Sequence, residues 1–471
     1  MFKLPNLSNF DHSDGNTMYM AIYDSIKSSI AEKDMEPNEK LPSKRKLARR
    51  LGVSVKTVEN AYEQLLLEGY IYSREKSGYF VEEITDFRVN ICKIPEYDTR
   101  FYETEYKVNL RANRNAIEDF PADTWCKLIR ETLAENREKL FKTVPFNGLF
   151  ALRKAICAYL LQNRGMVVSP DQIVIGAGTE YMYSRLGQVL GRGVTYALPE
   201  PCSQRLHELY ENNNLNYKMI HASKEGFDLE GLENSDCNVI HISPQHQFPL
   251  GKIMPVQEKV ELLKWANRKK GRYIIEDDYD SEYVVLGRPI QPLYSIDVND
   301  KVIYMNTFSK SVSPAVRISY MILPEELMDR FLGTMSFYSC TVANLEQYAL
   351  TKFIEGKHLE RYTHRIHRKN KKIRHFLIQN LEKLEEDGVL KMETDCVNAM
   401  VVIRLKTLLV DARIKELLKQ NDIITSMMSE YYTSAELKQK YSGEIIINYS
   451  GLTEERIIYL CDVLRIIGKE K

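Results

Sequence analysis

The sequence of 471 residues has no excess of either charge. Lys and Arg total 65, and Asp and Glu also total 65, so the formal net charge is zero. This balance excludes a uniformly basic nucleic-acid-binding surface and an acidic disordered tail. The 22 glycines and 16 prolines are too few for a low-complexity chain, and a hydrophobic content of 44% is typical of a globular protein. The length predicts about two to three domains.

Long apolar runs and paired cysteines are also missing. No run approaches the roughly 18 apolar residues that cross a bilayer, and the first six residues lack the apolar core of a signal peptide. We therefore expect a cytoplasmic protein that does not bind membranes. The cysteines form neither CxxC nor zinc-like pairs, so we expect reduced thiols and no metal site. They are Cys92, Cys126, Cys157, Cys202, Cys237, Cys340, Cys396 and Cys461.

One short segment is strongly basic despite the overall balance. Residues 43–60 contain six lysines and arginines but a single acidic residue, Glu59. Such a run can be a solvated helix face, or it can bind an anionic partner. The local structure that the surrounding sequence predicts favours the second interpretation.

That local structure is three helices followed by a hairpin. Apolar residues at helical spacing mark the helices, and Ser43 and Ser54 are suitable N-caps for the second and third. The predicted helices cover 17–33, 43–51 and 54–68, and the predicted strands cover 70–72 and 79–81. Helices joined by a tight turn and followed by a hairpin form a winged helix-turn-helix.

The geometry of such a domain indicates which residues contact DNA. A recognition helix enters the major groove with its N-terminal residues, and the start of the preceding helix offers amides and cations to phosphate. The tip of the wing can approach the backbone or the minor groove. The candidate DNA-binding residues are Ser43, Lys44, Arg45, Ser54, Lys56, Thr57, Asn60, Ser77 and Gly78.

This segment, roughly 17–82, resembles the GntR-type winged-helix domain. The motifs LPSKRKLA, LGVS, TVENAYEQLLLEGY and SGYFV occur in the family's order. The resemblance implies DNA contacts by four residues, which are Arg45, Ser54, Lys56 and Thr57. The family usually has Arg after the Ser of LGVS, where this sequence has Val55, so a base-reading contact is lost or moved to Lys56.

The remainder of the chain predicts a larger α/β domain. We expect a tail over 1–16, the winged helix over 17–83, a linker over 84–107 and one domain over 108–471. Short apolar strands alternate there with helices such as 256–269, which predicts a doubly wound, mostly parallel sheet. A smaller α+β subdomain with two helical segments is expected over about 355–471. The predicted strands are 174–175, 239–242, 273–275, 302–305, 318–323, 400–403 and 445–447.

Three strand ends in this domain carry residues suited to binding a small molecule. The small residues of 175–180 let backbone amides approach a phosphate at a helix N-terminus. An acidic cluster, 276–280, ends the strand at 273–275, where α/β sheets bind ligands. Metal binding is an alternative for this cluster, but no His accompanies the carboxylates. Lys310 follows the next strand, and Arg317 lies seven residues later.

Taken together, these elements resemble fold-type-I proteins that bind pyridoxal phosphate. With the winged helix, residues 17–465 resemble the MocR/GabR-type subfamily of GntR regulators, in which a GntR domain is fused to an aminotransferase-like domain. Further matching segments are DFPADTW (119–125), GLFALRKAICAYL (148–160), SPQHQFPLGKIMP (243–255), IIEDDYDSEY (274–283) and TFSKSVSPAVRISYMILP (307–324).

The resemblance implies pyridoxal 5'-phosphate as cofactor and a role for each matching residue. Lys310 would form a Schiff base with the cofactor aldehyde, Asp277 would face the pyridine nitrogen, and Tyr279 would hydrogen-bond the ring phenolate. Arg205 corresponds to an arginine of the family's ligand pocket. The phosphate would be held by Ala177, Gly178, Thr307 and Arg317, and the other edge of the ring would be lined by His246 and Gln247.

Two departures from the family pattern bear on catalysis. A Tyr that stacks on the cofactor ring is replaced by Ser203, which cannot stack. Near the C-terminus, relatives often carry an Arg that binds a substrate carboxylate, but this chain reads NYSGL over 448–452 with Gly451. A buried carboxylate without a cation is costly. The departures argue against ordinary transamination of an α-amino acid more than against cofactor binding.

Three functional hypotheses follow. The first is a transcription regulator that binds double-stranded DNA and pyridoxal phosphate and senses a small amine or the vitamer itself, as a head-to-tail homodimer like its relatives. The second is an active aminotransferase. The third is a DNA-binding protein with a non-catalytic dimerisation body, which the retained set of Lys310, Asp277, Tyr279 and Arg317 disfavours.

Overall fold

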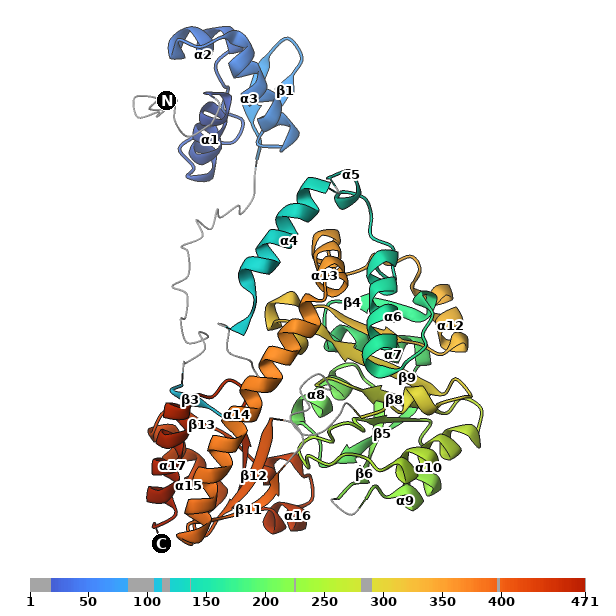
Figure 1. Ribbon diagram of the computed structural model, residues 1–471. Coiled ribbons are helices and arrows are strands. Elements are labelled where there is room, and N and C mark those ends of the chain that lie inside the picture. Colours follow the sequence, from blue (N-terminus) through green and yellow to red (C-terminus); the bar gives the residue numbers. More distant parts are fainter. Residues whose placement is uncertain are drawn as a thin grey trace. The chain divides into compact units, whose positions relative to one another are not determined.

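The computed structural model describes most of the chain. The described residues are 18–83, 106–111, 119–135, 137–223, 226–280, 290–395 and 399–470. The chain divides into two compact units, Met1–Glu103 and Thr104–Lys471 (Figure 1). The predicted tail, nearly all of the predicted linker, Cys92, Cys396 and the end of the IIEDDYDSEY motif lie outside the described residues.

The first unit is a winged helix-turn-helix, as predicted. Its elements are α1 (Met18–Ala31), α2 (Lys44–Leu51), α3 (Val55–Leu67), β1 (Ile71–Arg74) and β2 (Gly78–Val81). The strands pair antiparallel, with Ile71 opposite Val81. Ile22, Leu47 and Leu65 come from the three helices and are fully buried in one core. Burial of each such side chain contributes about 1.5–3 kcal/mol.

Caps define both ends of α2 and the start of α3. The Ser43 hydroxyl accepts a hydrogen bond from the Lys46 amide at 3.3 Å, and the Ser54 hydroxyl accepts one from the Thr57 amide at 3.0 Å. Gly52 ends α2 with φ +69°, a conformation that glycine adopts at little cost. The exposed beginning of α3 is thereby held at a defined angle to α2.

The second unit contains a seven-stranded sheet in the order β4-β10-β9-β8-β7-β5-β6. Its strands are β4 (Ile173–Gly176), β5 (Thr195–Glu200), β6 (Asn216–His221), β7 (Val239–Ile242), β8 (Tyr273–Asp277), β9 (Val302–Thr307) and β10 (Ser319–Ile322). Strands β5 to β9 pair parallel with one another, and β10 is antiparallel to both β4 and β9. The predicted mostly parallel sheet is confirmed, but the prediction missed β5 and β6.

Helices cover both faces of this sheet (Figure 1). Ile173 and Ile175 of β4 pack on one face with α6 (Phe150–Arg164) and α13 (Asn344–Glu355). Val174 points to the other face, toward α7 (Thr179–Leu190) and α12 (Glu325–Met335). This alternation follows from the two-residue period of a strand. The remaining helices here are α4 (Ala122–Glu135), α5 (Arg137–Leu140), α8 (Gln204–Asn212), α9 (Leu229–Asn234), α10 (Val256–Asn267) and α11 (Phe308–Ser311).

The chain continues into a smaller α+β part. A long helix, α14 (His358–Glu386), leads into a sheet of order β11-β12-β15-β14. Its strands are β11 (Leu390–Asp395), β12 (Met400–Leu405), β14 (Ser426–Met427) and β15 (Glu444–Asn448), and its further helices are α15 (Asp411–Gln420), α16 (Ala435–Lys440) and α17 (Glu454–Ile467). The prediction of two helical segments was wrong, because four α-helices begin after residue 355 in the described part of this stretch.

The N-terminal end of the second unit belongs to this smaller part. The strand β3 (Val108–Asn109) pairs parallel with β13 (Ile423–Ile424), more than 300 positions later in the chain. Val108 and Ile423 are both fully buried in the core of the small subdomain. Every helix of the described ranges is too short or too polar to cross a lipid bilayer.

Candidate functional site

The carboxyl ends of three strands meet at one edge of the large sheet. Gly176 ends β4, Asp277 ends β8 and Thr307 ends β9. The first residue of β10, Ser319, pairs with both Gly176 and Thr307. Lys310 and Arg317 lie in the short connection from β9 to β10. The topology therefore brings the three predicted ligand-binding strand ends to the edge where α/β sheets bind ligands.

Lys310 lies over an aromatic ring at this edge. Its Nζ atom is 3.9 Å from the centre of the Tyr279 ring. Burial lowers the pKa of the Lys310 ammonium, while the carboxylates of Asp280 and Asp277 oppose this effect. A lowered pKa increases the share of neutral amine, which is the nucleophilic form of lysine.

The hydroxyl of Tyr279 is held by a buried histidine. It lies 3.2 Å from Nδ1 of His246 and 3.3 Å from the carbonyl oxygen of His246. The same Nδ1 is 2.7 Å from Oδ2 of Asp280, and both residues are buried. The loop that carries His246 and the segment after β8 are thus linked by side-chain contacts that orient the phenol.

Asp277 has one engaged and one open carboxylate oxygen. Its Oδ2 accepts a hydrogen bond of 2.6 Å from the Tyr183 hydroxyl, and Nε2 of His241 lies 3.8 Å away. His241 is fixed in turn by Tyr210, whose hydroxyl is 3.0 Å from Nδ1. The other oxygen, Oδ1, is buried and has no hydrogen-bond partner among the described residues. A buried acceptor left open in this way fits a ligand that brings an N–H donor.

Gly178 and Arg317 form a tight contact at the N-terminus of α7. Gly178 has φ +98°, and a Cβ atom at this position would lie 2.4 Å from the Arg317 guanidinium. Only glycine therefore allows the arginine to lie against the backbone at the start of α7. The contact combines a cation with helix N-terminal amides, an arrangement that suits a phosphate.

Glu180 contacts the two arginines that the sequence had marked for ligands. The Arg317 guanidinium lies 3.4 Å from Oε2 of Glu180, and Arg205 forms a close ion pair with Oε1. Arg205 lies in the first turn of α8, directly after Ser203, whose hydroxyl caps this helix by accepting from the Leu206 amide at 3.2 Å.

The other predicted phosphate ligands have partners within the protein. The Ala177 amide donates to the Thr341 hydroxyl at 3.1 Å. The Thr307 hydroxyl caps α11 and lies 2.8 Å from the Ser319 hydroxyl. Beside Lys310, the Ser309 hydroxyl is buried with no partner in the described part of the chain. Gln247, predicted at the ring's edge, accepts a loose 3.4 Å bond from the Ser243 amide.

The small subdomain contacts the same edge of the sheet. The Glu200 carboxylate at the end of β5 accepts a 2.7 Å bond from the Thr433 amide. The Cys202 amide donates to the Tyr431 carbonyl at 3.3 Å, and the Tyr431 ring packs edge-on against Phe248 at 5.1 Å. The site is therefore bounded by both parts of the second unit.

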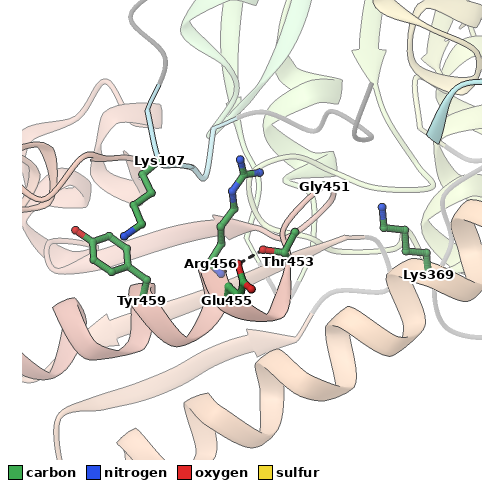
Figure 2. A pocket seen from close by; sticks show the side chains of 7 residues that line it. All are labelled: Lys107, Lys369, Gly451, Thr453, Glu455, Arg456 and Tyr459. Atoms are coloured by element: carbon green, nitrogen blue, oxygen red, sulfur yellow. Dashed lines mark hydrogen bonds between the residues drawn. The ribbon is translucent and has the colours of Figure 1, made fainter. Parts of the chain in front are cut away.

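Gly451 lies beside a different cavity. A pocket of about 510 Å³ opens at the N-terminus of α17 (Figure 2). Its lining residues are Lys107, Lys369, Gly451, Thr453, Glu455, Arg456 and Tyr459. Lys107 lies over the Tyr459 ring at 3.5 Å, and Lys369 pairs with Asp119 at 2.6 Å. None of the candidate cofactor residues lines this pocket.

The candidate DNA-binding residues come from the starts of α2 and α3 and from the wing of the first unit. Arg45, Ser54 and Lys56 are exposed, and Thr57 and Asn60 are half-buried on α3. Of the wing residues, Ser77 lies in the turn between β1 and β2, and Gly78 begins β2 with φ +111°.

Lys44 differs from the expectation of a lysine available to phosphate. Its ammonium is 2.9 Å from Glu59 and lies 5.4 Å from the Tyr79 ring centre. Lys56 also pairs with Glu59, at 3.0 Å. The single acidic residue of the basic segment therefore pairs with two of its cations, while Arg45 remains exposed.

Several residues of the site were missed by reasoning from the sequence. Tyr183, His241 and Glu180 contact predicted residues, and Gln245 is buried with both amide atoms lacking a partner within the described ranges. Tyr183 looks like a core residue of an amphipathic helix, and no local motif marks it. Gln245 adjoins the HQF motif of residues 246–248, which was the only available signal.

Comparison with known proteins gave consistent matches for both units. Residues 105–464 match the family described as aminotransferase class I and II, and residues 18–81 match the bacterial regulatory proteins of the gntR family. The chain is 33% identical to the HTH-type transcriptional regulator YdeL of Bacillus subtilis, covering 78% of this chain and 79% of that one. It is 28% identical to the HTH-type pyridoxine biosynthesis transcriptional regulator PdxR of Corynebacterium glutamicum, covering 73% and 74%. An archaeal alanine:glyoxylate aminotransferase structure shares the fold, with a TM-score of 0.67 and 22% identity over 77% of this chain and 90% of that one.

Proposed function

Because the chain belongs to the aminotransferase class I and II family and joins this domain to a GntR-family domain, as MocR/GabR-type regulators do, we propose that it is a transcription regulator that holds pyridoxal phosphate on Lys310. The observation that carries the proposal is the open, buried Oδ1 atom of Asp277 at the same sheet edge as Lys310 and the Gly178–Arg317 contact. A protonated pyridine nitrogen, an aldehyde and a phosphate would each find a complementary group there.

When bound, pyridoxal phosphate supplies an aldehyde that condenses with primary amines and a ring that accepts electrons. Lys310 offers an amine whose pKa is lowered by burial. Asp277, oriented by Tyr183 and His241, would keep a proton on the pyridine nitrogen. Tyr279, whose hydroxyl donates to the His246 carbonyl, would redirect this hydrogen bond to the ring oxygen.

Charge and backbone geometry support a phosphate at the start of α7. Arg317 and the amides that follow Gly178 supply the cation and the helix N-terminus, with Ala177 beside them. Thr307 acts mainly by capping α11, because its hydroxyl is already engaged, and the neighbouring Ser309 hydroxyl is available instead.

We propose a small amine or the vitamer itself as the signal. Ser203 caps α8 and offers no aromatic ring for stacking, and Arg205 is already paired with Glu180. An amino acid bound at the described part of this sheet edge would therefore find no free cation for its α-carboxylate. The relative named for pyridoxine biosynthesis supports the vitamer.

The first unit would carry the DNA-binding function. Arg45 and the exposed start of α3, with Ser54 and Lys56, fit the phosphate backbone and the major groove. We propose that the protein acts as a head-to-tail homodimer with the domain boundaries predicted above, so that two winged helices meet two half-sites. Ligand-induced movement of the small subdomain would change the spacing of the two winged helices.

Replacement of Lys310 by Ala in the full-length protein tests the proposal. We expect the wild type to show a saturable absorbance change with pyridoxal phosphate and to bind a duplex that it has selected from a randomised pool. The Lys310→Ala variant should lose the absorbance change and keep binding to the selected duplex. The matched control is Lys301→Ala, a lysine at the opposite end of β9, which should keep both. A Lys310→Ala variant that keeps both the absorbance change and DNA binding, or loses both, would contradict the proposal.

A further inference from the structure

Glu180 occupies the space between two arginines at the predicted phosphate site. It lies in the first turn of α7, while Arg205 belongs to α8 and Arg317 to the β9–β10 connection. One carboxylate oxygen contacts each guanidinium. The three side chains are 36%, 72% and 52% exposed, so that the cluster is reachable from solvent.

Arg317 lies against the backbone at the N-terminus of α7. Its guanidinium contacts Gly178, where the absence of a Cβ atom leaves room for it. The cation that would receive a phosphate is therefore already paired with a carboxylate. A phosphate dianion arriving at Arg317 meets the negative charge of Glu180 and must displace it or remain next to it.

Arg205 is positioned to influence whether Glu180 is displaced or remains next to the phosphate. It pairs with the oxygen of Glu180 that does not face Arg317. Because its side chain is 72% exposed, it has the freedom to move together with Glu180. While Arg205 remains paired with Glu180, it draws the Glu180 carboxylate away from an incoming phosphate.

On the premise of the function proposed above, we propose that Glu180 is an internal competitor of the cofactor phosphate for Arg317, and that Arg205 is a positioning residue that acts through Glu180. Binding of pyridoxal phosphate is then an exchange of one anion for another. Such an exchange weakens the apparent affinity for the cofactor, which allows occupancy to follow the concentration of the vitamer. This positioning role of Arg205 differs from the direct ligand contact implied by the family resemblance.

The competition predicts a selective effect of Glu180→Gln. In the full-length protein, the dissociation constant for pyridoxal phosphate should fall roughly fivefold, because a partly exposed charge interaction is worth up to about 1 kcal/mol. The constant for pyridoxal, which lacks the phosphate, should not change. The control is Glu208→Gln, which removes the same charge from an exposed position on α8 bonded to Gln204. It should leave both constants unchanged.

A double-variant comparison tests the part played by Arg205. Arg205→Ala alone should weaken binding of pyridoxal phosphate, since Glu180 is then no longer drawn away from Arg317. In the Glu180→Gln background, Arg205→Ala should have no further effect. A loss that persists in that background would overturn the positioning role and assign Arg205 a direct contact.

The outcomes separate this inference from the proposed function. A wild type that binds pyridoxal phosphate, together with a Glu180→Gln variant that binds it no more tightly, would overturn the competition alone. Equal tightening for pyridoxal and pyridoxal phosphate would also overturn it, because the effect would not depend on the phosphate. A wild type that binds neither compound would overturn the proposed function and, with it, the competition.

Discussion

Glu276 provides a quantitative test of how the acidic cluster of β8 is divided between structure and function. Its side chain is fully buried, and its oxygens accept 2.8 Å bonds from the amides of Leu293 and Tyr294. Burial, reinforced by the carboxylate of Asp278, raises the pKa of Glu276 from 4.5 to about 7. Asp277, one residue later, points to the opposite face of the strand.

The raised pKa gives a stability effect with a definite sign. Between pH 4.5 and about 7 the folded state retains a proton that the unfolded state has lost, so the free energy of unfolding falls as the pH rises through this window. Glu276→Gln removes the titration and should flatten this dependence. Because one pKa unit corresponds to about 1.4 kcal/mol, the stability of the variant relative to wild type should rise by about 2 to 3 kcal/mol between pH 5 and pH 8.

Tryptophan fluorescence during urea unfolding reports on the stability of the second unit, which contains Glu276. The two tryptophans of the chain, Trp125 and Trp265, both lie in the second unit. Any constant cost of losing one carboxylate oxygen cancels in the comparison between pH values. A difference in stability between Glu276→Gln and wild type that does not change with pH would refute the reasoning. The variant should still bind pyridoxal phosphate, since Glu276 lies on the face away from Asp277.

Two further predictions concern DNA binding by the first unit and pyridoxal phosphate binding by the second unit. Arg45→Ala should weaken binding to the selected duplex and lower the slope of log affinity against log salt by about 1, because one phosphate contact is lost. Fluorescence anisotropy at several salt concentrations measures this, with Lys419→Ala of the second unit as the charge-matched control; unchanged affinity would contradict the assignment. Tyr183→Phe removes the 2.6 Å bond to Asp277 and should weaken pyridoxal phosphate binding roughly tenfold, while DNA binding is retained. An unchanged affinity in the absorbance titration would show that Tyr183 does not support Asp277.

The elements that the sequence predicts well carry strong local signals. The winged helix follows from apolar residues at helical spacing and from two serine caps, both of which act within one turn of a helix. The central strands of the large sheet are continuous apolar runs, such as Ile274–Ile275, because both faces are covered by helices. By contrast, β5 contains Pro199, and β6 lies at the edge of the sheet with alternating exposed residues, so neither resembles a buried central strand.

The candidate site also combines residues that local sequence motifs predict with contacts that depend on the fold. Lys310, Asp277 and Arg317 stand in motifs that follow strands, so their meeting at one sheet edge could be predicted. The contact of Tyr183 with Asp277 spans 94 positions, and that of Arg317 with Glu180 spans 137. No local pattern encodes such pairings, since they depend on where a helix packs on the sheet. The engagement of Lys44 by Glu59 was missed for the same reason.

The most direct test of the account is covalent trapping at Lys310. The full-length protein is incubated with pyridoxal phosphate, reduced with borohydride, digested and mapped by mass spectrometry. The account predicts one saturable phosphopyridoxyl modification on the peptide that contains Lys310, which is absent from the Lys310→Ala variant. A wild type without this modification, or with labelling spread equally over surface lysines in both proteins, would contradict the account.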